Sequence, residues 1–321
     1  MRVVIVFLLS ALLPLCCCHA RDPFAWLYGP QSQRFASLQA NTNGQECPDV
    51  CDCPPTFPAA MYCDGRGLTA MPSIPSRVKY LYLQNNAITA VPDSALVNAT
   101  NLVWLMMHYN QLTSDTIGKK VNLHLVSVGS SHTWVTPADL EGMDNLTILY
   151  LHDNSVTDVG TSLKALKSLM LLDISGNKLT KVPDALPEQL HQLYLQSNSI
   201  DSLPEDFLGG FTQLQYVRIA HNQLTDKGIP ANTFNVTGLV ELDLSYNKLE
   251  RIPPVSTTLE HLYLQANQIK GKFTLGSFCS IVDVTNFSKL QTLRLDGNEI
   301  SLQDIPTDSA LCLRLASNIK V

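Results

Sequence analysis

Aliphatic residues recur through the middle of the chain in one pattern, Leu-x-x-Leu-x-Leu-x-x-Asn-x-Leu, with conservative replacements. The pattern occurs nine times, at successive spacings of 24, 44, 23, 21, 24, 25, 20 and 31 residues. The asparagines that mark it are Asn86, Asn110, Asn154, Asn177, Asn198, Asn222, Asn247, Asn267 and Asn298. The spacing of 44 indicates one more unit, with Val126 and Val128 at aliphatic positions and Ser131 in place of the asparagine. Such a period is typical of leucine-rich repeats and predicts ten units, one of them degenerate.

Each Leu-x-Leu predicts a short strand, because alternate side chains of a strand point to the same face. One unit cannot bury its leucines alone, so the units are expected to stack and their strands to form a parallel sheet. The asparagine amide can satisfy backbone groups of the turn that follows. Prolines of the opposite, convex side favour short extended or turn segments over helices. These are Pro92, Pro183, Pro187, Pro204, Pro253 and Pro254.

The expected fold is therefore a β-rich member of the α/β class, a leucine-rich repeat solenoid. We expect a curved parallel β-sheet on its concave face and short irregular or 3-10 segments on its convex side. Repeats are predicted over residues 77–270, and the degenerate unit around 122–137 is expected to be the least regular part.

The first twenty residues are typical of a secretory signal peptide. Arg2 is followed by thirteen apolar residues at 3–15, and small residues precede a cleavage site after Ala20. A membrane anchor is the alternative, but it needs about 18 or more apolar residues. No other segment is long and apolar enough to span a bilayer. Residues 21–46 then form a short N-terminal extension, which we expect to be flexible.

Removal of the signal peptide leaves six cysteines, an even number in an oxidising compartment where disulfides persist. Four lie in a predicted N-terminal cap at residues 47–76, and two lie in a predicted C-terminal cap at 271–321. They are Cys47, Cys51, Cys53 and Cys63 in the first cap and Cys279 and Cys312 in the second. A zinc site is the rival interpretation of the first cluster, but the cluster lacks a CxxC pair, so no metal is expected. The spacing alone leaves three connectivities open.

The charge balance is mildly acidic, with 22 Lys and Arg against 28 Asp and Glu, which argues against a nucleic-acid binder. Neither a nucleophile elbow nor an HExxH, P-loop or dinucleotide-binding motif is present, so no catalytic residue and no cofactor is predicted. Asp173 and Asp243 come from distant repeats and are interpreted as solvated surface charge. Four histidines are likewise interpreted as ordinary surface residues at repeat positions. These are His108, His152, His221 and His261.

The cysteine spacing, the flanking Cys53-Pro54-Pro55, and the long final spacing together resemble the class II small leucine-rich repeat proteoglycans. The resemblance covers residues 47–321 and includes Ser277-Phe278-Cys279 and Val282-Asp283-Val284. It implies that the first and third cysteines of the N-terminal cap pair, as do the second and fourth. It also implies that the two C-terminal cysteines hold an extended "ear" repeat. The implied pairs are Cys47 with Cys53, Cys51 with Cys63 and Cys279 with Cys312.

The chain departs from the family pattern in two places. Related proteins carry an acidic, tyrosine-rich segment before the first cysteine, a substrate for tyrosine sulfation, whereas residues 21–46 hold Tyr28 and only two acidic residues. Functions that depend on a sulfated tail are therefore not expected to carry over. The family pattern also has about one more repeat than residues 111–153 accommodate.

Function in a leucine-rich repeat protein belongs to the exposed strand positions, and positions 3, 5, 7 and 8 of each unit should face the concave side. These positions collect eight of the ten tyrosines. Tyrosine and arginine combine apolar area with a polar group, as interfaces require, although tyrosine also simply suits strands. The full set is Tyr80, Tyr82, Tyr109, Tyr150, Tyr194, Tyr216, Tyr246, Tyr263, Trp104, His108, His152, His221, His261, Arg218, Arg294, Asp173, Glu241, Asp243 and Asp296. Our candidate ligand-binding residues are Tyr82, Tyr150, Tyr194, Arg218, Asp243, Tyr263, Arg294 and Glu299.

The resemblance implies that the ligand is fibrillar collagen. Glu299 keeps an acidic residue of the family's collagen contact, whereas Ser301 stands where the family has a lysine. We therefore expect a secreted extracellular-matrix protein that binds collagen and regulates the assembly and spacing of fibrils. The alternative is a signalling or sequestering module that binds a receptor, or a growth factor of the transforming-growth-factor-beta type, through the same face.

Four sequons are acceptors for N-linked glycans in a secreted protein. Their asparagines are Asn98, Asn145, Asn235 and Asn286. They lie at a similar phase of their repeats, near the start of a strand motif. The resemblance implies that such glycans are extended into keratan sulfate, which would hold water and space neighbouring fibrils.

Overall fold

The computed structural model describes residues 47–111, 125–129, 143–271, 273 and 287–321. The predicted signal peptide, the extension at 21–46 with Tyr28, Ser131, Cys279 and Asn286 lie outside these residues.

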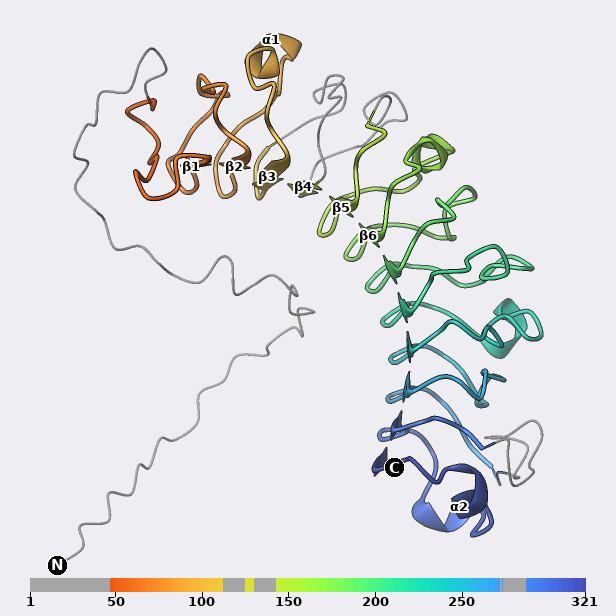
Figure 1. The fold of residues 1–321 in the computed structure, drawn as a ribbon. Helices are drawn as coiled ribbons and strands as arrows, with labels where there is room; N and C mark the ends of the chain where they lie inside the picture. Colours follow the sequence, from red (N-terminus) through yellow and green to blue (C-terminus); the bar gives the residue numbers. More distant parts are fainter. Residues whose placement is uncertain (1–46, 112–124, 130–142, 272, 274–286) are drawn as a thin grey trace, which may run out of the picture. The chain divides into compact units, whose positions relative to one another are not determined.

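The described residues form a twelve-stranded parallel sheet in which strand order equals chain order (Figure 1). Its strands are β1 (Ala60–Tyr62), β2 (Tyr80–Tyr82), β3 (Trp104–His108), β4 (Leu125–Gly129), β5 (Ile148–Tyr150), β6 (Leu171–Asp173), β7 (Gln192–Tyr194), β8 (Tyr216–Arg218), β9 (Glu241–Asp243), β10 (His261–Tyr263), β11 (Thr292–Arg294) and β12 (Asn318–Lys320). The ten predicted units supply β2 to β11, so the predicted solenoid is confirmed. The sheet is one strand longer at each end, because the N-terminal cap contributes β1 and the residues after the last repeat contribute β12.

The tenth, degenerate unit contributes a full strand. In β4, Leu125 pairs with Trp104 of β3 and Gly129 pairs with His108, which makes this pairing five residues long. On its other side, β4 continues in register with β5. The predicted irregularity of residues 122–137 otherwise falls outside the described residues and stays a prediction.

Helices are few and short in the described residues, as the prolines predict. The helices are α1 (Asp93–Leu96) and α2 (Ser309–Cys312), and the 3-10 segments are η3 (Ser162–Ala165), η4 (Asp226–Gly228) and η6 (Leu302–Asp304). Pro92 is the N-cap of α1, where a missing backbone N–H is harmless. These segments lie on the side of the stack away from the strands (Figure 1).

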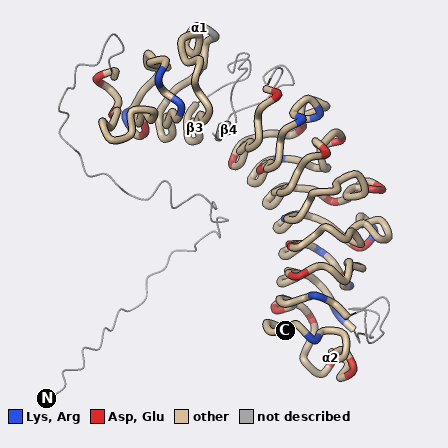
Figure 2. The backbone as a smooth tube through the Cα atoms, in the orientation of Figure 1, with Lys and Arg blue, Asp and Glu red and all other residues tan. Residues whose placement is uncertain are grey.

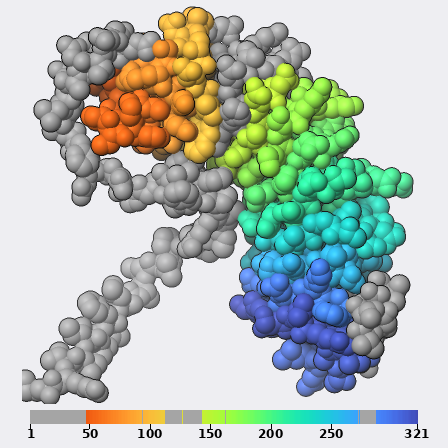
Figure 3. Space-filling view, viewed as in Figure 1, coloured from red at the N-terminus to blue at the C-terminus, as the bar shows by residue number. Residues whose placement is uncertain are grey.

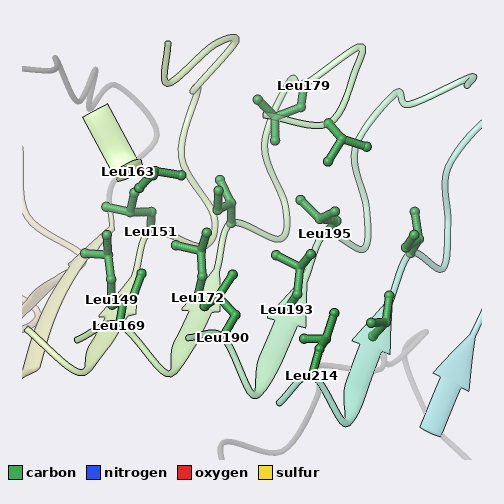
Figure 4. Packing of buried hydrophobic residues seen from close by; sticks show 14 of the residues in the cluster. Leu149, Leu151, Leu163, Leu169, Leu172, Leu179, Leu190, Leu193, Leu195 and Leu214 are labelled. Carbon is green, nitrogen blue, oxygen red and sulfur yellow. The ribbon is translucent and has the colours of Figure 1, made fainter. Parts of the chain in front are cut away.

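Leucines of successive units fill the space between the strands and the opposite side. Leu149, Leu172 and Leu193 project from neighbouring strands into the same layer, and all three are completely buried (Figure 4). From residue 143 onward, the units form adjoining bands in chain order (Figure 3). Each unit therefore buries its apolar side chains against its two neighbours, as a solenoid requires.

The repeat asparagines join neighbouring units by side-chain hydrogen bonds. Asn222, which is 3% exposed, accepts a bond from the backbone N of Ile200 in the preceding unit, at 2.9 Å. Its Nδ2 donates to the carbonyl of Leu195 in that unit at 3.0 Å and to Ile219 in its own unit at 3.2 Å. The same arrangement recurs at Asn110, Asn177, Asn198, Asn247, Asn267 and Asn298. We call this series the asparagine ladder.

Disulfides close the N-terminal end of the stack. Cys47 is bonded to Cys53 and Cys51 to Cys63, which are the pairs that the family resemblance implied. Between them, Asp52 and Tyr62 exchange two backbone hydrogen bonds of 2.8 Å in an antiparallel bridge. Cys312, which is completely buried, is also disulfide-bonded. Its implied partner Cys279 lies outside the described residues.

Candidate functional site: the sheet face

The candidate site is the face of the sheet that points away from the leucine core. In the three-residue strands β1, β2 and β5 to β11 the central residue is buried, and the residues on both sides of it project to the opposite face. In β3 the core residues are Leu105 and Met107. We call this surface the sheet face; it corresponds to the predicted concave face.

Seven of the eight candidate ligand-binding residues fall into a single row across the sheet face. Strand pairing places Tyr194 beside Arg218, Arg218 beside Asp243, and Asp243 beside Tyr263. We call this the central row, and it runs Tyr62, Tyr82, Met106, Ser127, Tyr150, Asp173, Tyr194, Arg218, Asp243, Tyr263, Arg294 and Lys320. The sequence interpretation therefore selected residues that the fold does bring together.

The eighth candidate, Glu299, does not belong to the central row. It follows the turn after β11, where its backbone N donates to the carbonyl of Ile269, and its side chain is exposed. Ser301, which replaces the family's lysine, caps η6: its backbone N and its Oγ each donate to Asp304 at 2.8 Å. Glu299 and Ser301 thus both lie outside the strands that form the central row.

Burial divides the central row into two parts. Tyr82, Tyr150 and Tyr194 are only 5 to 7% exposed, so their rings pack against neighbouring side chains rather than face solvent. Burial raises the pKa of Tyr194 to about 12, so its hydroxyl stays neutral and donates to Gln192 Oε1 at 2.6 Å. The residues from Arg218 onward are at least partly exposed, and so is Tyr62 at the other end of the row, so the row is accessible at its two ends.

Ion pairs cover the C-terminal strands. Arg218 donates to Glu241 at 2.7 Å, and its guanidinium lies 5.0 Å from the ring centroid of Tyr194. Arg294 makes two bonds to Asp296, of 3.0 and 2.7 Å, and this pairing lowers the pKa of Asp296. Acidic and basic positions are interspersed along the coloured chain (Figure 2). This part of the sheet face therefore offers both signs of charge in fixed geometry.

Asp173 and Asp243 are not the solvated charges that the sequence indicated. Asp173 is 9% exposed, and its Oδ1 accepts bonds from the backbone N and the Oγ of Ser175 at 2.9 and 2.6 Å. Asp243 makes the same two bonds to Ser245. Burial raises the pKa of both carboxyl groups, and the serine bonds oppose that effect. Each carboxylate thus accepts hydrogen bonds from the turn of its own unit instead of facing solvent. The Asp-x-Ser spacing, which both units share, could have indicated this from the sequence.

Of the four histidines, His108 departs from the surface interpretation, whereas His221 is exposed as predicted. His108 is largely buried, which lowers its pKa to about 4, so the ring is neutral at physiological pH. His152 bonds to Asp153 through Nδ1 at 3.1 Å. His221 stacks on Tyr246 with ring centroids 4.0 Å apart. Within the described residues, no group of three or more His, Cys, Asp or Glu side chains is placed to hold a metal ion.

The residue before each repeat asparagine has a left-handed backbone. These residues are Asn85, Tyr109, Asp153, Gly176, Ser197, His221, Tyr246, Ala266 and Gly297, with φ between 52° and 75°. Only two are glycine, although this conformation is unfavourable by roughly 1–2 kcal/mol for other residues. Tyr109 and Tyr246 are both 48% exposed there, so the turn presents large rings at the rim of the sheet face.

An aromatic cluster covers the N-terminal strands of the sheet face. Tyr62 stacks on Tyr82 with centroids 4.7 Å apart, Phe57 stacks on Tyr80 at 5.4 Å, and Tyr80 meets Trp104 edge-on at 5.1 Å. The sequence interpretation missed Phe57 and Tyr62, because the cap that holds them lacks the repeat pattern. The sequence Ala-Met-Tyr of β1 has one aliphatic core residue between a small and an aromatic residue. This pattern could have indicated the strand and the exposed position of its tyrosine.

Three of the four sequon asparagines lie within the described residues, and all three are exposed. Asn98 follows α1 and lines a groove together with Pro72 and Pro92. Asn145 and Asn235 each lie shortly before a strand, β5 and β9. Their exposure is compatible with glycan attachment. No helix in the described part of the chain has the length and apolar character that crossing a membrane requires.

Comparison with known proteins matches this architecture. The leucine rich repeat N-terminal domain matches residues 46–75, and leucine rich repeat models match residues 212–231 and 238–257. In a solved octameric complex of Latrophilin 3, Unc5D and FLRT2 (LRR), one chain is 29% identical with a TM-score of 0.68. The match covers 85% of this chain and 83% of that chain.

Curated relatives extend over most of the chain. Fibromodulin from Bos taurus is 50% identical over 304 residues, covering 86% of this chain and 81% of the relative. Fibromodulin from Homo sapiens is 48% identical over the same shares. Lumican from Gallus gallus is 42% identical and covers 86% of this chain and 88% of the relative. The predicted resemblance to the class II small leucine-rich repeat proteoglycans is therefore confirmed. Of the relatives named here, the fibromodulins have the higher sequence identity and lumican follows. The chain belongs to the fibromodulin and lumican family of extracellular-matrix small leucine-rich repeat proteoglycans.

Proposed function

We propose that this protein is secreted into the extracellular matrix, binds fibrillar collagen through the sheet face and regulates the assembly and spacing of fibrils. The observation that carries the proposal is the sheet face itself. Its twelve strands give eleven spacings of about 4.8 Å, a length of roughly 50 Å, which suits an elongated protein ligand. Family membership supports a role in the matrix.

The accessible charges of the sheet face support contact with a protein that carries both signs. Arg218 and Glu241 pair with each other, as do Arg294 and Asp296, and all four side chains keep part of their surface in solvent. A ligand with charges of both signs could exchange partners with these pairs without leaving one unpaired. Such complementarity sets orientation and specificity more than raw affinity.

Glycans at the sequons would leave the sheet face open. Asn98, Asn145 and Asn235 lie outside the strands, so long anionic chains attached there would extend away from a ligand on the sheet. We propose that these chains, extended to keratan sulfate, hold water and space neighbouring fibrils.

Co-sedimentation with reconstituting type I collagen tests the proposal. The glycosylated protein is expected to pellet with fibrils and to change the turbidity curve of their assembly. Tyr263→Ala combined with Arg294→Ala should weaken pelleting, because both side chains are partly exposed in the central row. Lys181→Ala, at an exposed site away from the strands, is the matched control. A protein that neither pellets nor changes the turbidity would refute collagen binding, and binding of a transforming-growth-factor-beta-type ligand would then be the next measurement.

A further inference from the structure

Five aromatic side chains gather in two adjacent groups at the N-terminal end of the sheet face: Tyr62 with Tyr82, and Phe57 with Tyr80 and Trp104. We call these five side chains together the aromatic platform. Phe57 is 44% exposed, and Tyr62, Tyr80 and Trp104 are each partly exposed, whereas Tyr82 is buried and supports Tyr62 by stacking. Neighbouring rings are 4.7 to 5.4 Å apart. Apolar side chains that gather at one place on a surface mark an interaction site more often than single scattered ones do.

The aromatic platform carries no formal charge. Strands β1, β2 and β3 contain no Asp, Glu, Lys or Arg, whereas β8, β9, β11 and β12 each contain at least one. His108, at the end of β3, is neutral at physiological pH because burial lowers its pKa to about 4. Charged residues flank the strands: Lys79 directly precedes β2, and Asp64 follows β1. Burial and, to a smaller extent, Asp64 raise the pKa of Tyr62. Asp52, which is bridged to Tyr62 through the backbone, pairs with Arg66. The two ends of the sheet face therefore differ in chemistry.

The chemistry and spacing of the aromatic platform fit a strand rich in proline. Aromatic-lined surfaces recognise polyproline II strands, because pyrrolidine rings stack on aromatic rings and the strand loses little entropy on binding. A polyproline II strand repeats every three residues, about 9.3 Å, and two strand spacings of the sheet are about 9.6 Å. The register places Ala60, Tyr80 and Trp104 in one row. A strand laid along that row could thus place one residue over Trp104 of β3 and the equivalent residue two strands away over β1, where Phe57 stacks on Tyr80.

We propose that the aromatic platform docks an uncharged, proline-rich strand in the polyproline II conformation, which the Gly-X-Y chains of collagen provide. This inference rests on the proposed function and assigns the collagen segment to one end of the sheet face. Sugar rings also stack on aromatic rings, but a hydroxyl-rich ligand needs carboxylates and amides beside them. Strands β1 to β3 supply no carboxylate, and of the flanking ones at the Tyr62 end Asp52 is already paired with Arg66, so we favour the proline-rich strand.

The test uses a triple-helical peptide made only of Pro-Pro-Gly triplets, with binding to the intact glycoprotein measured by calorimetry. Tyr80→Ala should weaken binding about threefold to tenfold, the effect of losing one aromatic contact. Tyr216→Ala is the matched control, because Tyr216 is also partly exposed and occupies the same position of its repeat in β8. This control should leave peptide affinity unchanged. Because the contact is uncharged, salt should change the affinity little.

Further variants separate lost binding from lost folding. Phe57→Ser alters an exposed side chain of the cap, outside any strand, and should weaken peptide binding in a protein that melts normally. Tyr80→Phe keeps the ring and should bind as the parent does. If Phe57→Ser and Tyr80→Ala both bind the peptide normally, or if Tyr216→Ala weakens it equally, the inference is wrong.

Comparison with whole collagen distinguishes the two proposals. Pelleting with type I collagen fibrils, together with no affinity for the Pro-Pro-Gly peptide, overturns the platform inference and leaves the proposed function standing. Tyr80-dependent peptide binding without pelleting supports the platform chemistry and overturns the proposed function. Binding of an N-acetylglucosamine tetramer that is lost in Tyr80→Ala, with no peptide binding, identifies a carbohydrate site instead.

Discussion

Removal of one rung of the asparagine ladder should destabilise the whole protein. Asn222→Ala deletes an amide that is 3% exposed and hydrogen-bonded to two units. The carbonyls of Leu195 and Ile219 keep a bond from Asn198 and from Asn247 respectively. The backbone N–H of Ile200 is left without the partner that it has in the native protein.

The magnitude follows from these bonds. Burying one unsatisfied N–H is unfavourable by about 1–3 kcal/mol, and each further hydrogen bond contributes about 0.5–1.5 kcal/mol. Asn222→Ala should therefore lower the free energy of unfolding by about 2–6 kcal/mol, a large share of the roughly 5–15 kcal/mol that proteins have. The free energy of unfolding of Asn222→Ser should lie between those of the native protein and Asn222→Ala, because a hydroxyl replaces only part of the amide's hydrogen bonding.

Urea unfolding followed by far-ultraviolet circular dichroism measures this loss. Gln223→Ala is the matched control, since Gln223 is the next residue and is exposed. The control should change the free energy of unfolding by less than about 0.5 kcal/mol. If Asn222→Ala also changes the free energy of unfolding by less than about 0.5 kcal/mol, water replaces the hydrogen bonds of the amide. The asparagine ladder would then not stabilise the contact between units.

Asp173→Asn should stabilise the protein at neutral pH, because burial raises the pKa of this carboxyl and an amide oxygen can keep both bonds to Ser175. The folded pKa lies above the unfolded one, so the gain should be complete above the folded pKa and vanish as the pH falls below the unfolded value, in pH-dependent urea titrations. Ala266→Gly should raise the free energy of unfolding by about 0.5–1 kcal/mol, because Ala266 has a φ of 54° that glycine adopts without strain. Expression in animal cells should yield a secreted protein whose N-terminal sequence starts at Arg21.

Matched variants make these expectations refutable. Asp184→Asn, at a side chain 73% exposed, should show none of the stabilisation of Asp173→Asn, and equal effects would mean that burial is not the cause. Ala220→Gly, at a buried alanine outside the set with positive φ, should destabilise the protein, and a gain there would contradict the backbone argument. A secreted product that retains residues 1–20 would contradict the predicted cleavage.

The fold was predictable because one pattern repeats along the chain. Nine asparagines at near-constant spacing fix the phase of every leucine, and the phase fixes which residues share the sheet face. For this reason the candidates Tyr194, Arg218 and Asp243 proved to be neighbours in one row. The degenerate unit was recoverable from spacing alone, and its strand β4 pairs in register.

Burial on the sheet face was not predictable, because it depends on neighbours in the next unit. Asp173 is enclosed between adjacent strands and bonded to Ser175, and nothing in its own unit predicts how deeply it lies. The left-handed backbone of the residue before each asparagine could not be predicted from the sequence for another reason. Residues such as Tyr246 and Ala266 occupy it, and neither favours that conformation. Tyr62 was missed because the cap has no repeat to set its phase.

The asparagine ladder connects each unit to the one before it by the same hydrogen bonds. Each asparagine bonds only to its own unit and to the one before it, and both sides of the junction are the same from one unit to the next. Excision or insertion of one complete unit is therefore expected to recreate the asparagine bonds at the new junction, whereas pairs such as Arg218 with Glu241 belong to one junction only. The number of units can change while the asparagine bonds of each junction stay constant. A lineage with one unit fewer would differ in the length of ligand that it spans, about 4.8 Å per unit, and not in its ability to fold.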